Sequence, residues 1–180
     1  MTSLLDLFAR QTPKPPKPRV FVSYHHAYDE PFAERFRRLF DDTHDIVTDR
    51  SLEERIDSDD SDYVYQRIRE DFITGTSCTI VLCGRETMNR KHVDWEIKAT
   101  LDKGHSLLGV RLPTLPCRFD GKYVVPDRLH ENLMSGYAHW TAWTGNALEM
   151  RIAILEARVK ALDSHPQRFA HAFAEPLRDR

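Results

Sequence analysis

The chain has 180 residues, of which 41% are hydrophobic and 30% charged, which suits one soluble domain with short additions. Its net charge of −2 argues against a nucleic-acid-binding surface, and no apolar run approaches the roughly 20 residues that span a bilayer. The three cysteines, Cys78, Cys83 and Cys117, lack metal-like spacing, and an odd number without a disulfide framework predicts a reducing, cytoplasmic environment.

The first 18 residues are predicted to be an extension that precedes the domain. The segment MTSLLDLFAR has neither the basic start nor the long apolar stretch of a secretion signal, so we expect none. The segment TPKPPKP, residues 12–18, is a stiff Pro/Lys linker that cannot be helical. The folded domain is therefore expected to begin at residue 19.

A strand, a helix and a second strand are predicted next. RVFVSY, residues 19–24, is a short, nearly continuous apolar run, which is typical of a strand buried on both faces. Asp29 is placed to cap the following helix, with Pro31 in its first turn. DIVTD, residues 45–49, is a short second strand, and the acidic loop 51–62 leads into another helix.

The strongest strand pattern of the chain is SCTIVLCG, residues 77–84. The loop after it ends in Asn89, which we expect to cap a helix over residues 90–103. Gly104 follows that helix and suits a left-handed residue at its carboxyl end. This region therefore predicts a strand, a loop and a helix in close succession.

The carboxyl-terminal third is less regular. SLLGVRL, residues 106–112, predicts a fourth strand, and residues 113–136 are expected to be an irregular insertion because they are rich in proline and glycine. AHWTAW, residues 138–143, is a weak fifth strand. Asn146 with Glu149 resembles a capping box. The last helix then carries an apolar stripe of Leu148, Ile152, Leu155, Val159 and Leu162.

Strands that alternate with helices indicate an α/β fold with a parallel sheet and helices on both faces, a three-layer sandwich. Right-handed crossovers and five strands favour the flavodoxin-like strand order 2-1-3-4-5. The predicted domain covers residues 19–163, and residues 164–180 form a tail without clear periodicity.

In such sheets, ligands bind beyond the carboxyl ends of the strands, where the strand order reverses. Here that crevice lies between the first and third strands. Solvated loop residues are an equally open interpretation of the polar side chains found there. The side chains that leave the strands at this edge are Tyr24, His25 and His26 after the first, Asp49 after the second, and Arg85 and Thr87 after the third.

The helix over residues 90–103 carries a carboxylate close to that crevice. Glu96 and His92 lie one turn apart at the edge of its apolar face, so the carboxylate should be half shielded from water. The alternative is a solvated glutamate that only supports the helix. The apolar face that must pack on the sheet consists of Val93, Ile97, Thr100 and Leu101.

Other catalytic templates do not fit the sequence. It has no Gly-rich phosphate loop and no nucleophile elbow. Neighbouring residues of an extended strand point to opposite sides, so His25 and His26 are poorly arranged to bind one metal ion, and we expect no metal site. A phosphate-accepting receiver domain would need acidic residues where this chain has Tyr24, His25 and His26.

Three segments, VFVSYHH, TSCTIVLCGRETMNRKHVDWEIKATLDKG and LLGVRL, resemble the TIR-like proteins of bacterial antiphage systems of the Thoeris type. The resemblance covers roughly residues 19–112. It implies a flavodoxin-like fold and cleavage of NAD+ at the nicotinamide glycosidic bond. It also implies that the ADP-ribose part becomes a signal that activates a partner effector protein.

The resemblance also implies roles for single residues. Glu96 matches the glutamate that TIR enzymes need for catalysis, and Tyr24 and His25 match positions that line the nucleotide pocket. The family often has tryptophan four residues before this glutamate, whereas this chain has His92 there and Trp95 next to the glutamate. Both are predicted to contact substrate. Arg85 and Thr87 match the loop facing the pocket, and His26 and Asp49 complete the predicted substrate-binding set.

A single glutamate is chemically plausible for this reaction. Breaking the bond builds oxocarbenium charge on the ribose, and a fixed carboxylate can stabilise that charge. Nicotinamide leaves as a neutral molecule, so a strong general acid is unnecessary. Tyr24 or Trp95 could stack on a ring of the substrate, and His25 or Arg85 could bind the pyrophosphate.

The expected partners follow from the same resemblance. NAD+ is the substrate and no further cofactor is expected; a phage component would be the trigger and an effector protein the recipient of the signal. Assembly into a homo-oligomer or filament on activation is a further expectation, with residues 50–62 as a candidate contact. Two alternatives stay open: a non-catalytic TIR-like assembly module, and a flavodoxin-like protein that binds a flavin or nucleotide.

Overall fold

A computed structural model describes residues 17–48 and 61–164 of the chain. Four parts of the predictions lie outside these residues: the extension up to residue 16, Asp49, the acidic loop up to residue 60, and the tail 165–180. No helix in the described part is both long enough and apolar enough to cross a membrane.

The structure contains one five-stranded parallel sheet in the order β2-β1-β3-β4-β5, as predicted. The strands are short and end at the same edge of the sheet, so their carboxyl ends converge there. Their bounds are Arg19–Ser23 (β1), Asp45–Thr48 (β2), Cys78–Cys83 (β3), Ser106–Arg111 (β4) and His139–Ala142 (β5).

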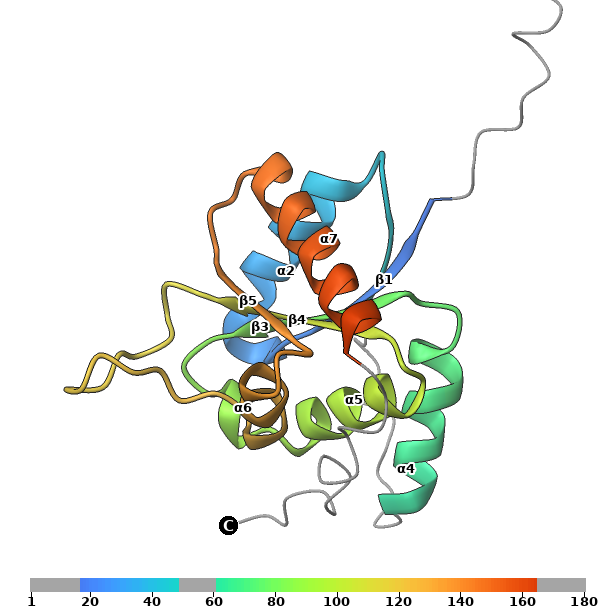
Figure 1. The fold of residues 1–180 in the computed structure, drawn as a ribbon, viewed down its shortest axis with the longest axis horizontal. Coiled ribbons are helices and arrows are strands. Elements are labelled where there is room, and N and C mark those ends of the chain that lie inside the picture. Colours follow the sequence, from blue (N-terminus) through green and yellow to red (C-terminus); the bar gives the residue numbers. More distant parts are fainter. Residues whose placement is uncertain (1–16, 49–60, 165–180) are drawn as a thin grey trace, which may run out of the picture.

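Helices cover both faces of the sheet and complete the three-layer α/β sandwich (Figure 1). One face carries α2 and α7, and the other carries α5 and α6, with α4 at its end. The helical bounds are His26–Phe40 (α2), Ser61–Arg67 (α4), Lys91–Asp102 (α5), Asp127–Met134 (α6) and Ala147–Asp163 (α7), with a π-helical turn at Ile68–Ile73 and a 3-10 turn at Thr87–Asn89.

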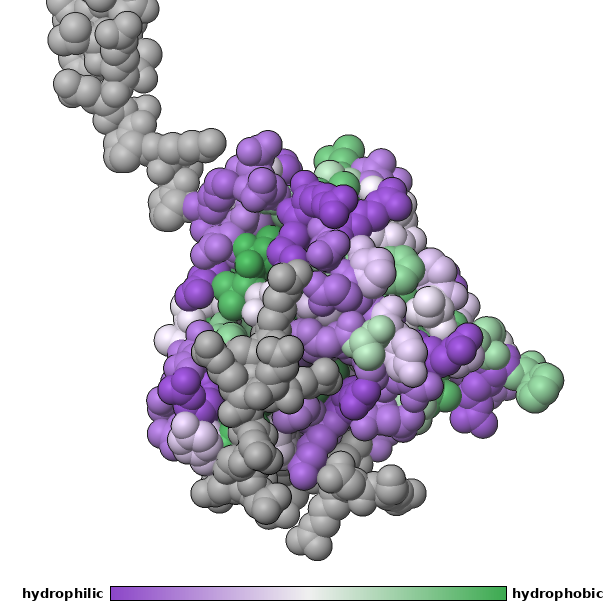
Figure 2. Space-filling view, turned by 180° about the vertical axis from the view of Figure 1, so that it is seen from behind, coloured by the Kyte–Doolittle hydropathy of each residue, from purple (hydrophilic) through white to green (hydrophobic). Residues whose placement is uncertain are grey.

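Strand alternation decides which layer each side chain of β1 enters. Val20 and Val22 pack with α2 and α7, whereas Phe21 points the other way and packs with α4 and the side of α5 around Trp95. Both faces of β1 are therefore buried, as its apolar run predicted. Seen from behind, the outer surface is mainly hydrophilic, with smaller hydrophobic areas between the polar ones (Figure 2).

Three local predictions at helix starts have different outcomes. The prediction for Asp29 was wrong: α2 begins at His26, and the backbone carbonyl of His25 accepts the Asp29 N–H at 2.8 Å. The prediction for Asn89 was also wrong, because Arg90 is the residue before α5 and no side chain caps that helix. Asn146 does cap α7, where its side-chain oxygen accepts the backbone N–H groups of Leu148 and Glu149.

The region 113–136 is more regular than predicted, since it contains α6, whose Leu129 packs with α5 and β4. Prolines and glycines are confined to the segment before this helix and to Gly136 after it. Gly104 follows α5 with a φ of +67°, which is the left-handed conformation that its position predicted.

Candidate functional site

Glu96 lies on the side of α5 that faces the sheet. One turn later, the Thr100 hydroxyl lies 2.6 Å from the Thr79 hydroxyl of β3, which ties the helix to the strand. Glu96 lies one turn before Thr100, closer to the amino end of α5. The amino end of this helix lies beside the carboxyl ends of the strands, because α5 follows β3. Because Ser23 pairs with Val81 two residues beyond Thr79, Glu96 lies near the last residues of β1 and β3.

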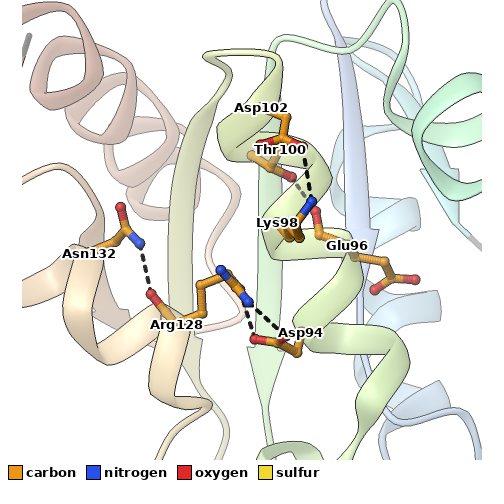
Figure 3. A network of polar contacts seen from close by, with 7 residues as sticks. All are labelled: Asp94, Glu96, Lys98, Thr100, Asp102, Arg128 and Asn132. Carbon is orange, nitrogen blue, oxygen red and sulfur yellow. Dashed lines mark hydrogen bonds and ion pairs between the residues drawn. The ribbon is translucent and has the colours of Figure 1, made fainter. Parts of the chain in front are cut away.

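The Glu96 side chain is much less exposed than its place at the edge of the apolar face predicted. Only 5% of the residue is exposed, whereas we expected a half-shielded carboxylate. The apolar face itself is buried as predicted, at Val93, Ile97 and Leu101. Figure 3 shows the Glu96 carboxylate pointing to the side of α5 away from α6. Trp95 and Ala99, its neighbours on α5, pack with α4 and the turn after it, so this part of α5 lies inside the fold.

Trp95 and His92 form a cluster in the first turns of α5. Trp95 is buried, the His92 ring meets it edge-on with centroids 5.5 Å apart, and the Lys91 ammonium lies 5.1 Å from the indole centroid. The indole N–H has no hydrogen-bond partner among the described residues. A buried N–H of this kind is costly to leave unpaired, so it is a candidate for binding a ligand oxygen.

Ser23 is a second buried polar group at this place. It ends β1, and strand alternation directs it to the same layer as Phe21 and therefore toward α5. Its hydroxyl is buried without a hydrogen-bond partner in the part of the chain that the structure describes. Ser23 was not among the predicted site residues, although the alternation of RVFVSY assigns it to the same layer as Phe21.

His25 is buried at the edge of the site, on the α5 side. Its ring Nε2 contacts the guanidinium of Arg90, the residue that precedes α5, and its centroid is 4.9 Å from that of Tyr28. Arg90 is half-buried and was not predicted as a site residue. The pair joins the loop after β1 to the loop after β3 and places a guanidinium at the edge of the sheet.

Tyr24 and His26 lie on the opposite layer from Glu96. Tyr24 belongs to the buried cluster around α2 and α7, and its hydroxyl donates to Glu30 on α2 at 2.5 Å. The His26 ring stacks near Tyr24 at a centroid distance of 4.4 Å, and Arg37 binds the other oxygen of Glu30 at 3.3 Å. The structure therefore separates these two predicted residues from Glu96.

Asp29 is a buried carboxyl group at the centre of three loops. Thr87 donates to one of its oxygens at 3.4 Å, and Thr114 to the other at 3.5 Å. Burial raises the pKa of Asp29 to about 6, against the opposing effect of these hydroxyl groups. Gly84 is required beside it, because a Cβ at that position would lie 2.3 Å from a carboxylate oxygen.

The remaining predicted residues have separate places. Thr87 is buried in the Asp29 network, where its hydroxyl also accepts the Gly84 N–H at 2.8 Å, and Arg85 is exposed. Asp49 lies outside the described residues. The structure thus brings Glu96, Trp95 and His92 together on α5, with the buried His25 next to the start of that helix.

Two hollows formed by described residues lie elsewhere, and neither is lined by Glu96. One is near the amino end of β2 and is lined by Arg37, Asp41 and His44 among others. The other lies beside α7. Among residues 17–48 and 61–164, no three histidine, cysteine or carboxylate side chains gather as metal ligands would.

Comparison with known proteins gives one sequence match. Residues 21–116, more than half of the chain, match the family model described as "Thoeris protein ThsB, TIR-like domain". This range begins within β1, continues through β4 and contains Glu96. No curated protein matches the sequence. Among solved structures, the TIR domains in "Structure of the activated Roq1 resistosome directly recognizing the pathogen effector XopQ" match with 12% identity over 82% of each chain and a TM-score of 0.39.

Proposed function

The chain belongs to the family of Thoeris ThsB proteins with a TIR-like domain, and from this premise we propose that it cleaves NAD+ between nicotinamide and ribose with Glu96 as the catalytic residue. Membership implies TIR-type processing of NAD in antiphage defence. We further propose that the ADP-ribose part is hydrolysed or cyclised into a signal that activates a partner effector.

The observation that carries the proposal is the place of Glu96. It is a carboxylate with 5% exposure, on the sheet-facing side of α5, near the carboxyl ends of β1 and β3 where the strand order reverses. Ligands of such sheets bind at this edge. Buried ionisable side chains at such an edge are frequently functional, which supports a role for Glu96.

Glu96 would act on the ribose as positive charge develops there. The bond between the anomeric carbon and the nicotinamide nitrogen breaks, and its electron pair stays on the neutral nicotinamide. The carboxylate stabilises the oxocarbenium ion from a position fixed by the contact between Thr100 and Thr79. Water or an ADP-ribose hydroxyl then attacks the anomeric carbon and loses a proton.

Other groups of the site are assigned to substrate binding. The Ser23 hydroxyl and the Trp95 indole N–H are buried without partners among the described residues and suit hydrogen bonds to ribose or nicotinamide oxygens. His25 with Arg90 suits the pyrophosphate, because guanidinium groups bind phosphate oxygens in pairs. Arg85 and Thr87 border the same edge, while Tyr24 and His26 hold the loop through Glu30.

Access to Glu96 requires that side chains around it move, since so little of it is exposed. This requirement agrees with an enzyme that stays inactive until a phage component triggers it. The burial of Glu96 and Trp95 equally favours a second candidate function, a TIR-like module that assembles without turnover. The two candidates differ in whether nicotinamide is released.

The test is nicotinamide release from NAD+ by the purified full chain, with and without lysate from phage-infected cells. We expect release by the triggered wild type and a loss of at least about 100-fold in Glu96→Gln, which keeps the shape but removes the charge. Glu131→Gln is the matched control, because Glu131 is exposed on α6, and it should keep full activity.

Thermal unfolding of each variant separates lost chemistry from lost folding. If Glu96→Gln folds normally and releases as much nicotinamide as the wild type, the assignment of Glu96 is wrong. If neither protein releases nicotinamide under any trigger, the non-catalytic assembly module becomes the better description.

A further inference from the structure

Helix α7 is apolar on two sides, and only one of them is buried. Met150, Ala153, Ile154 and Ala157 pack against the sheet and α2. The stripe predicted from the sequence faces solvent instead, with exposures between 47% and 86%. A helix that is apolar all round is normally covered on both sides. We call the exposed side the α7 stripe: Leu148, Ile152, Leu155, Val159 and Leu162.

The spacing of the α7 stripe is that of a coiled-coil seam. Its members follow one another at steps of four, three, four and three residues, which is the alternation of the two core positions of a heptad. Ile152 and Val159 are β-branched and occupy the first core position, and leucines occupy the second. This division is the one that favours two parallel helices.

The residues that flank the α7 stripe carry opposite charges on its two sides. The residue after each leucine of the stripe is acidic. The residue before each β-branched residue of the stripe is basic. All of them are exposed. The acidic side consists of Glu149, Glu156 and Asp163, and the basic side of Arg151 and Arg158.

We propose that α7 pairs in parallel with α7 of a second copy of this chain. In a parallel pair the basic side meets the acidic side five residues later, so Arg151 lies opposite Glu156 of the partner subunit and Arg158 opposite Asp163 of the partner subunit. An antiparallel pair would oppose arginine to arginine and carboxylate to carboxylate. The charges therefore select both the partner and the orientation.

The stripe spans little more than two heptads, which is short for an isolated coiled coil. This chain avoids the main difficulty, because α7 is already held in helical form by its own domain and pays no nucleation cost on pairing. A hollow lined by Ile152, Leu155 and Val159 borders the stripe and can accept side chains from the partner. Glu156 binds His139 at 2.8 Å but keeps 54% of its side chain exposed for a second cation.

This interface does not depend on the proposed enzymatic activity. Helix α7 lies in one helical layer, whereas α5, which carries Glu96, lies in the other layer, across the sheet (Figure 1). Pairing through α7 therefore leaves the edge of the sheet beside Glu96 uncovered in both chains. Nicotinamide release and self-association test separate claims.

Sedimentation velocity of the full chain tests the pairing. We expect the wild type to have about twice the 21.0 kDa mass of one chain, and Leu155→Glu to weaken association at least about tenfold. The matched control is Met134→Glu, which places the same charge at an exposed apolar residue of α6 and should keep the dimer. Leu155 is exposed, so the fold should tolerate its replacement.

Charge reversal tests the partner. Arg151→Glu/Arg158→Glu should be monomeric alone, and so should Glu156→Arg/Asp163→Arg, because each puts like charges across the pair. Mixing the two variants should restore a dimer that contains one chain of each. A mixture that stays monomeric, while both variants remain folded, overturns the proposal.

A cysteine at one end of the stripe tests the orientation. Leu162→Cys in a Cys117→Ser background should form a disulfide between two chains on mild oxidation, since equivalent core residues face each other only in a parallel pair. Failure to cross-link a chain that is dimeric by sedimentation overturns the parallel arrangement. A full-length wild type that sediments as a monomer overturns the proposal as well.

Discussion

At the scale of single residues, Asp29 and Gly84 show how the loops after β1, β3 and β4 are joined. The carboxyl group of Asp29 is fully buried and receives hydroxyl groups from Thr87 and Thr114. Gly84 leaves the space that this carboxyl group fills. The loops that border the candidate site are therefore held by one titratable group.

We expect Asp29 to make stability depend on pH between about 4 and 6. Its pKa is raised to about 6 in the folded chain, above an unfolded value of 3.8, so the folded state binds the proton more tightly. Its stabilising contribution is complete below pH 3.8 and is lost as the pH rises through 6. The free energy of unfolding of Asp29→Asn, relative to that of the wild type, should therefore rise by roughly 2–3 kcal/mol as the pH is raised from 4 to 7. Urea unfolding at both pH values measures this change.

The control is Asp127→Asn, which changes an exposed carboxylate in the first turn of α6. Its stability relative to the wild type should vary little over the same range. A stability difference between Asp29→Asn and the wild type that does not change with pH would contradict a raised pKa for Asp29.

Glu96 was predicted from the sequence, but its burial was not. The number of residues between β3 and Glu96, and the position of Glu96 on α5, can be counted in the sequence. Its exposure depends on tertiary packing around α5, where α4 and the turn after it pack against the neighbouring Trp95 and Ala99. Arg90 was missed for the same reason, since its contact with His25 joins loops 65 residues apart.

At the scale of secondary-structure elements, α6 is attached to α5 by a buried ion pair. Arg128 binds both oxygens of Asp94, at 3.0 and 3.2 Å, and both side chains are almost fully buried (Figure 3). Asn132 donates to the backbone carbonyl of Arg128 and completes the turn. This pair fixes α6 on the side of α5 opposite to the Glu96 carboxylate.

Removing one partner of this pair should be strongly destabilising. We expect Arg128→Met to lower the free energy of unfolding by about 3–5 kcal/mol, because it leaves the Asp94 carboxylate buried without its cation. The double variant Arg128→Met/Asp94→Leu should recover most of that loss, since it replaces both charges by apolar groups. Chemical denaturation of the three proteins measures both effects.

The exposed pair of Arg67 and Asp71, 2.7 Å apart, provides the comparison. Arg67→Met should cost less than about 1 kcal/mol, because solvent screens that pair. Equal losses in Arg67→Met and Arg128→Met would show that burial does not strengthen the pair on α6.

Helix α7 shows that hydrophobic periodicity predicts a helix but does not always predict which of its sides is buried. The pattern of Leu148, Ile152 and Leu155 predicted an amphipathic helix, and the helix exists. The same helix has a second apolar side, at Met150 and Ile154, and the structure buries that one. A sequence in which both sides are apolar does not decide which of them meets the sheet.

At the scale of the whole molecule, pairing through the α7 stripe would link stability to protein concentration. A dimer that dissociates on unfolding gains stability by mass action. We expect a hundredfold rise in the concentration of the wild type to raise its Tm by roughly 3–6 °C, measured by calorimetry. Leu155→Glu should have a Tm that does not change with concentration.

Met134→Glu should retain the concentration dependence of the wild type, because its charge lies on α6, away from the stripe. A wild-type Tm that is the same at all concentrations would contradict coupling between folding and self-association. This measurement is independent of any NAD+ cleavage.

The sequence by itself determined the α/β class, the strand order 2-1-3-4-5 and the position of Glu96 at the edge where that order reverses. These depend on local periodicity and on the handedness of crossovers, which adjacent residues encode. Only the tertiary structure decided that Tyr24 and Glu96 lie in different layers, that Asp29 is buried, and that the α7 stripe faces solvent. Those outcomes depend on which distant elements pack together, and residues far apart in the chain set the burial of each side chain.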